Sequence, residues 1–104
     1  MKYKVYWKEI KFLEIEKIND MYHSEIITEN VDKVAELGYP KTFINDIKEV
    51  DKELPKIVSN RLPDVNYLNE KGYDTKDIEK AIGKYINDTK CRRITDYISI
   101  EVEE

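Results

Sequence analysis

Both ends of this 104-residue chain alternate apolar and polar side chains with a period of two. Residues 3–7 do so with Tyr, Val and Trp, and residues 94–102 do so with Ile and Val. This period is typical of a strand with one buried face and one face in water. A strand needs a neighbour, and the most economical neighbour for the C-terminal strand is the N-terminal strand or hairpin. We therefore expect the two ends of the chain to meet in one antiparallel sheet.

The segment that follows the first strand is less clear. In residues 10–18, Ile10, Phe12 and Glu14 fall on one face of a strand, so the start of the segment is expected to be the hairpin partner. Ile15 and Ile18 also fit helical spacing, which leaves the end of the segment open. Residues 22–27 are expected to form a third strand.

Helix signals fill the middle of the chain. Asn30 is expected to cap a helix that runs through Leu37, with Gly38 as a left-handed stop and Pro40 beyond it. Apolar residues between 54 and 62 predict a short helix with Pro55 in its first turn and Pro63 after its end.

Two further helices are expected before the last strand. Asp64 is expected to cap a short one that Gly72 closes. Asp74 or Thr75 is expected to cap the clearest one, with apolar residues at 78, 81, 82, 85 and 86. The predicted fold is α+β, one domain over residues 1–104: a small antiparallel sheet, made of the N-terminal hairpin plus the C-terminal strand, with three to four short helices packed on one face.

Composition excludes several classes of function. Three Gly leave no room for a glycine-rich phosphate loop. One Cys excludes a disulfide framework and a multi-thiolate metal site, and one His excludes most zinc chemistry. We expect no cofactor. No apolar run approaches the length of about 20 residues that a membrane span needs, so a cytoplasmic protein without a membrane contact is expected. The net charge of −4 argues against direct DNA binding.

Residues that carry chemistry are sparse, and no enzyme activity is expected. A Ser-His-acid site would use His23 with Ser24, Ser59 or Ser99, but none of these serines lies in a sequence typical of a strained nucleophile turn. The pair Glu14 and Glu16 is most simply a solvated face.

Cys91 lies among Lys90, Arg92 and Arg93, which would favour its thiolate. A half-buried structural thiol is the favoured reading of this cysteine, because no histidine partner is evident in the sequence.

Aromatic residues in the terminal strands are the candidates for partner binding. Tyr6 and Tyr97 are predicted on the outward faces of their strands, with Trp7 behind them, and tyrosine offers large contact area at low entropic cost. Ordinary surface tyrosines are an equally good reading. For Trp7, residence in the core is favoured over a role as a binding anchor.

Three short pieces of the chain, taken in order, are informative together. The first is Lys4-Val5-Tyr6-Trp7. The second starts with Leu54 and Pro55 and closes on Asn60, Arg61, Leu62 and Pro63, and the third is Thr89-Lys90-Cys91-Arg92-Arg93-Ile94-Thr95-Asp96. In this order they resemble the N-terminal subdomain of the HipA-type serine/threonine kinases, the toxins of bacterial toxin-antitoxin systems. Lys90 and Cys91 stand where that family tends to have two glycines, so a turn with positive φ would be made here without glycine.

The resemblance implies a small sheet-and-helix unit that lies on the N-lobe of a kinase and carries no phosphoryl-transfer residues. The sequence agrees, since it contains neither a Gly-rich loop nor a kinase catalytic segment. Some systems encode this subdomain as a separate short protein, HipS, which binds and neutralises a truncated kinase, HipT. The resemblance therefore implies a non-catalytic antitoxin or accessory subunit whose partner is a HipA/HipT-like kinase.

Alternatives from other classes stay open. One is a small acidic inhibitor from a mobile element, which masks a nucleic-acid-binding surface of a host or defence enzyme by presenting carboxylates. Another is a redox-responsive protein that acts through Cys91. An exposed hydrophobic edge could equally produce a homodimer.

Overall fold

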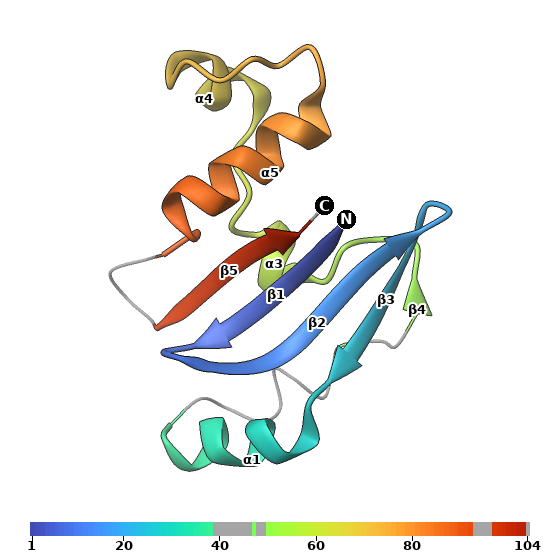
Figure 1. The fold of residues 1–104 in the computed structure, drawn as a ribbon, viewed down its shortest axis with the longest axis vertical. Coiled ribbons are helices and arrows are strands. Elements are labelled where there is room, and N and C mark those ends of the chain that lie inside the picture. Colours follow the sequence, from blue (N-terminus) through green and yellow to red (C-terminus); the bar gives the residue numbers. More distant parts are fainter. Residues whose placement is uncertain (39–46, 48–49, 93–96, 104) are drawn as a thin grey trace.

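The computed structural model describes residues 1–38, 47, 50–92 and 97–103. Figure 1 shows an α+β domain, as predicted, in which strands from both ends of the chain lie side by side. The strands are β1 (Lys2–Trp7), β2 (Ile10–Ile18), β3 (Met21–Ile26), β4 (Val50–Asp51) and β5 (Ile98–Glu103), and the helices are α1 (Thr28–Glu36), α3 (Lys56–Ser59), α4 (Val65–Glu70) and α5 (Ile78–Thr89).

The sheet is antiparallel, and its strand order is β4-β3-β2-β1-β5. The expectation that the terminal strands pair is confirmed, because β1 lies between β2 and β5 and pairs with both. Tyr3, Val5 and Trp7 are at most 5% exposed, and they lie opposite Val102, Ile100 and Ile98 in β5. The apolar residues at the two ends of the chain thus form one face of the sheet together.

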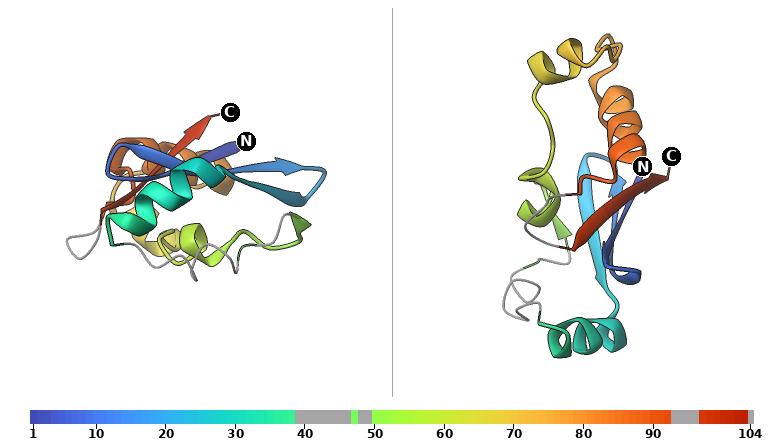
Figure 2. Two further views of the ribbon diagram at one scale, coloured as in Figure 1. Left: turned by 90° about the horizontal axis from the view of Figure 1, so that it is seen from below. Right: turned by 90° about the vertical axis from the view of Figure 1, so that its left-hand side faces the viewer.

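Helices complete the core against this apolar face. Val31 and Val34 of α1, Val58 of α3 and Ile86 of α5 belong to the same buried cluster as the inward residues of the sheet. Figure 2 shows the sheet from two further sides, with α3 on one side of it and α5 next to β5. Farther from the sheet, α4 packs on α5, where Leu68 and Ala81 are buried.

A β-bulge explains the mixed pattern of β2. The register with β1 passes from the pair Val5 and Leu13 to the pair Tyr6 and Lys11, so Phe12 is an extra residue with no partner in that register. Phe12 and Leu13 are therefore both fully buried although they are adjacent.

The bulge corrects two expectations. Glu14 pairs with Lys4 and lies on the polar face of the sheet, so the prediction that it shares a face with Ile10 and Phe12 is wrong. The helical reading of the end of this segment is also wrong, because residues 10–18 form one continuous strand. Ile15 and Ile18 are three residues apart, as in a helix, but they point to opposite faces of the strand: Ile15 is fully buried, whereas Ile18 is 45% exposed.

Tight turns join the first three strands. Asn19 and Asp20, between β2 and β3, both have positive φ, 50° and 65°. Two such residues between paired strands are typical of a hairpin turn, and Asn and Asp tolerate this conformation better than most side chains. Lys8, in the turn between β1 and β2, has a φ of 55° and no such advantage.

The predicted helices are present, with some boundaries corrected. Asn30 is not the cap of α1, because the helix begins at Thr28 and the Asn30 side chain instead donates to the backbone oxygen of Lys11 at 2.6 Å. Gly38 has a φ of 113°, as expected for a left-handed stop. Pro40 lies outside the described residues.

The caps of the later helices are only partly as predicted. Asp64 caps α4 by accepting from the backbone N–H of Tyr67 at 2.8 Å, and Gly72 follows with a φ of 85°. The cap of α5 is Asp77, whereas Asp74 or Thr75 was expected. Pro55 is the N-terminal flanking residue of α3 and not part of its first turn.

The side-chain amide of Asn87 forms hydrogen bonds with the backbone of β5 at the outer edge of the sheet. The Asn87 amide donates to the Val102 oxygen at 3.0 Å and accepts from the Val102 N–H at 2.9 Å, as a neighbouring strand would. Ile100 donates its N–H to the Lys90 oxygen at 2.8 Å. Helix α5 and the turn after it therefore satisfy part of this edge, which hinders addition of a further strand.

Candidate protein-binding surface

The three aromatic residues predicted for partner binding lie in different environments. Tyr97 directly precedes β5 and is 61% exposed. Tyr6 points outward from β1 but is half-buried, and its hydroxyl donates to Glu101 Oε2 at 3.2 Å. Burial, and then the nearby Glu101 carboxylate, raise the pKa of Tyr6. Trp7 is 5% exposed, so its expected place in the core is confirmed.

Trp7 and Tyr97 nevertheless meet at one end of the sheet, where they form what we call the aromatic end cluster with Lys8. The two rings are in edge-to-face contact, with centroids 5.3 Å apart and an interplanar angle of 73°. Lys8 Nζ lies 5.0 Å from the Trp7 centroid and 4.6 Å from that of Tyr97. The Lys8 N–H also donates to the Tyr97 oxygen at 2.9 Å. Trp7 and Lys8 therefore both contact the exposed Tyr97 ring, and Lys8 also hydrogen-bonds its backbone.

The second piece of the resemblance forms a structural junction around α3. Leu54 is half-buried against the core, and Pro55 accepts from the N–H groups of Val58 and Ser59 at the start of α3. Asn60 follows as the C-terminal flanking residue of α3. Arg61 donates from Nη1 to the Cys91 oxygen at 3.3 Å, which joins this piece to the third one, and the half-buried Pro63 leads on toward α4.

The third piece forms the turn after α5. Thr89 Oγ1 donates to the Tyr85 oxygen at 2.9 Å and accepts from the Cys91 N–H at 3.2 Å. Lys90 and Cys91 both have positive φ, 58° and 50°. The chain thus adopts without glycine the backbone conformation that glycines favour. Arg92 is exposed, whereas Thr95 and Asp96 lie outside the described residues.

Cys91 is buried at 5% exposure. The structure therefore agrees with the reading of a structural thiol, because a cysteine that reacts with an oxidant needs access to solvent. Its backbone oxygen, not its sulfur, makes the contact with Arg61.

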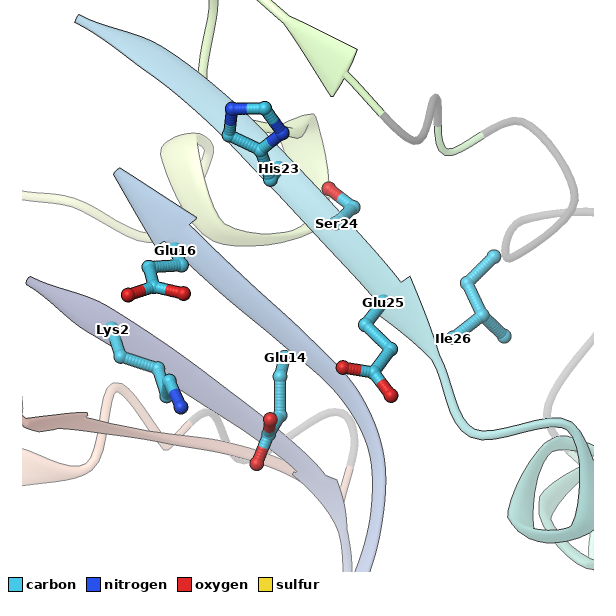
Figure 3. A pocket seen from close by; sticks show the side chains of 7 residues that line it. All are labelled: Lys2, Glu14, Glu16, His23, Ser24, Glu25 and Ile26. Carbon is cyan, nitrogen blue, oxygen red and sulfur yellow. The ribbon is translucent and has the colours of Figure 1, made fainter. Parts of the chain in front are cut away.

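The polar face of the sheet, which we call the open face, carries a groove that the sequence reasoning did not single out. The groove has a volume of about 550 Å³ and is lined by residues of β1, β2 and β3: Lys2, Glu14, Glu16, His23, Ser24, Glu25 and Ile26. Figure 3 shows the carboxylates of Glu14, Glu16 and Glu25 on the same side of the strands as Lys2. The predicted solvated face at Glu14 and Glu16 is therefore one wall of an acidic groove.

The neighbours His23 and Ser24 do not form a Ser-His pair. Ser24 lies opposite Ile15 and is 7% exposed, so its side chain is on the core side of β3. His23 lies opposite Glu16 on the open face. In the part of the chain that the structure describes, no group of three His, Cys, Asp or Glu side chains is placed to hold a metal ion.

Sequence signals for the acidic groove were weak because no local motif marks it. Glu14, Glu16 and Glu25 are ordinary members of a chain with 22 acidic residues, and their grouping depends on the pairing of β2 with β3.

Comparisons with known proteins identify no relative. No family model, no curated protein and no solved structure matches this chain. Within the described residues, no helix is long and apolar enough to cross a membrane. The two surfaces, the aromatic end cluster and the acidic groove, are therefore the observations that bear on function.

Proposed function

We propose that this chain is a non-catalytic protein-binding domain that binds a separate HipA/HipT-like serine/threonine kinase and neutralises it or completes its fold. The resemblance of the three sequence pieces supports this partner class. The observation that carries the proposal is the aromatic end cluster, in which a largely exposed Tyr97 is held by Trp7 and Lys8. An aromatic side chain that is ordered before binding loses little entropy on association, which is a property of interface hot spots.

The mechanism is a binding free energy and involves no bond chemistry. A standard interface of about 800 Å² per partner fits within the accessible surface of 6983 Å². Occupation of the kinase N-lobe would stabilise the kinase conformation that binds this domain best. Kinase activity falls if that conformation is nonproductive and rises if the domain completes the fold.

Co-purification with a tagged HipA-type kinase encoded beside this gene tests the proposal. Tyr97→Ala should weaken binding by about 30-fold or more, the effect of a hot-spot residue. Tyr67→Ala is the matched control, because Tyr67 is also an exposed tyrosine, at 40%, but lies on α4. Full binding by the Tyr97 variant, or no co-purification of the wild-type chain, would contradict the proposal.

The acidic groove favours a second candidate, a small acidic inhibitor that masks a nucleic-acid-binding surface of another enzyme. Carboxylates that replace phosphates produce an affinity that falls steeply with salt, whereas an aromatic anchor depends on salt far less. Measuring the affinity for the partner from about 50 mM to about 500 mM salt, across which screening increases strongly, separates the two candidates.

A further inference from the structure

We propose that two copies of this chain dimerise by exchanging strand β5, so that β5 of one copy pairs with β1 of the other. The place beside β1 is then filled by the same residues, Ile98–Glu103, from a second molecule. Exchange of an identical element is a low-cost route to a dimer, because it needs no new interface. The inference is independent of the kinase proposal, and its tests use no kinase.

Strand β5 is held by contacts that a second copy supplies equally well. Each of its residues pairs with β1, and Ile98, Ile100 and Val102 are at most 8% exposed. On the other side of the strand, the Asn87 side chain of α5 forms two hydrogen bonds with the Val102 backbone. Figure 1 shows β5 between β1 and α5. These contacts reform when β5 comes from another copy, so they do not oppose the exchange.

Polar side chains fix the register in which β5 binds. Lys4 Nζ lies 2.9 Å from Glu103 Oε2, and the Tyr6 hydroxyl donates to Glu101 Oε2 at 3.2 Å. A shift of the strand by one residue would turn these two glutamates toward the apolar core. A strand from a second copy therefore adopts the same pairing with β1.

Exchange changes the turn between α5 and β5. Lys90 and Cys91, which begin this turn, have φ values of 58° and 50°. Both values lie in the left-handed region, which is unfavourable for a residue that has a Cβ. In the exchanged dimer the chain continues from α5 to another molecule, so these two residues can leave that region. Short connections under strain favour exchange for this reason.

Hydrogen bonds of the turn oppose the exchange. The Cys91 N–H donates to Thr89 Oγ1 at 3.2 Å, and Arg61 Nη1 donates to the Cys91 oxygen at 3.3 Å. These bonds break when the turn straightens, and association also costs translational and rotational entropy. The monomer is therefore favoured in dilute solution and the exchanged dimer at high concentration.

The exchange would form the aromatic end cluster from two chains. Tyr97 directly precedes β5, and its ring contacts that of Trp7 at a centroid distance of 5.3 Å. Its backbone oxygen accepts from the Lys8 N–H at 2.9 Å. Since Tyr97 follows Lys90 and Cys91 in the chain, it moves with β5. Trp7 and Lys8 of one copy then contact Tyr97 of the second copy.

A disulfide between β1 and β5 distinguishes exchange from any other dimer. Lys2 and Glu103 lie directly opposite each other, so Lys2→Cys and Glu103→Cys can form one, with Cys91→Ala to remove the native thiol. The protein is warmed until it partly unfolds, because β5 must leave its own copy, and is then cooled at about 1 mM, where even weak dimers form. Gel filtration separates monomer from dimer, and both fractions are oxidised.

Denaturing electrophoresis without reductant reads out which chains the disulfide joins. The dimer fraction should give a covalent dimer, whereas the monomer fraction should give a single chain with an internal disulfide. A dimer fraction that contains only internally linked chains would overturn the proposal, and so would the absence of a dimer.

Variants of the turn test the role of strain with the native Cys91 in place. Lys90→Gly should weaken dimerisation about tenfold, because strain is then no longer relieved in either chain. Lys90→Val should strengthen it, since a β-branched residue tolerates positive φ least.

Lys84→Gly is the matched control, because Lys84 is an exposed lysine within α5, which is the same in monomer and dimer. It should destabilise the helix in both states and change the dimerisation constant less than twofold. Sedimentation equilibrium measures all three variants against wild type. A Lys90→Gly variant that dimerises as strongly as wild type, or a Lys90→Val variant that dimerises more weakly, would overturn the proposal.

Discussion

The two faces of the sheet are formed by the same strands and meet opposite requirements. On the apolar face, Tyr3 of β1 lies opposite Ile15 of β2, and both are almost completely buried. On the open face, Glu14 and Glu25 lie opposite each other with like charge. Lys11 and Lys4 offset this like charge at Glu14. Since burial of apolar area dominates the stability of a small domain, the first face holds the fold and the second can carry charges in water. The comparison shows that the apolar face fixes the fold, whereas the open face contributes mainly surface charge.

The largest expected effect comes from substituting neighbours that point to opposite faces. Ile15→Ala should lower the free energy of unfolding by about 2–5 kcal/mol, because it leaves a cavity at a fully buried position. Glu16→Ala, one residue along, should change it by about 0.5 kcal/mol or less. Urea denaturation measures both values, and similar losses would break the distinction between the faces.

Asn87 tests whether the edge of the sheet, rather than its open face, controls association. Asn87→Ala removes both hydrogen bonds to Val102 and should destabilise the domain by about 1–3 kcal/mol. It also frees backbone groups of β5, so self-association should increase with concentration. Sedimentation of the variant against wild type checks this expectation, and an Asn87 variant of unchanged stability and monomeric mass would refute it.

Tyr3 and Tyr6, on opposite faces of β1, should respond differently to alkali. Burial raises the pKa of Tyr3 to about 12 from a reference value of 10.0. The folded state therefore binds this proton more tightly, so the contribution is full below pH 10 and is lost as the pH rises toward 12. The loss should be on the order of 2 kcal/mol. Unfolding measured from pH 9 to pH 12 should show a smaller decline for Tyr3→Phe, whereas Tyr6→Phe should follow wild type more closely.

The turn after α5, which precedes the strand β5 shared by both faces, tests the cost of backbone strain. Lys90→Gly should stabilise the domain by about 1 kcal/mol, because Lys90 adopts a φ of 58° that glycine reaches without steric cost. The Lys90 contact with Glu101 is 3.5 Å long and exposed, so its loss should offset little of this gain. A destabilised Lys90→Gly variant in chemical denaturation would show that the side chain matters more than the backbone.

The smallest effect belongs to the ion pair of Lys11 with Glu14 on the open face. The hydrogen bond from Lys11 lowers the pKa of Glu14, so its contribution is present above the unfolded-state pKa and is lost as the pH falls through the folded-state pKa. The pair is partly exposed and should contribute about 0.5 kcal/mol or less. In thermal unfolding below pH 4.5, the reference value for Glu14, Lys11→Gln should slightly reduce the fall of Tm with falling pH. An unchanged dependence of Tm on pH would show that this pair does not contribute to stability.

Much of the secondary structure was predictable because its signals are local. Alternation identified β1 and β5, and Asp64, Gly38 and Gly72 marked helix ends through their own side-chain or backbone chemistry. The end of β2 was not predictable, because Ile15 and Ile18 are spaced as in a helix and only the pairing with β3 places them on opposite faces of one strand. The two-residue strand β4 was missed for the same reason, since its existence rests on pairing with Tyr22 and His23.

The sequence by itself determined the strand period at both ends of the chain, most of the helices, and the absence of the glycines that a phosphate loop would need. Only the tertiary structure decided which side chains meet: Tyr97 with Trp7, Arg61 with the Cys91 oxygen, and Glu14 with Glu25. The physical reason is that helix signals and strand period act over a few neighbouring residues. Cross-strand register is set by the burial of a whole face, and it brings together residues that no local pattern connects.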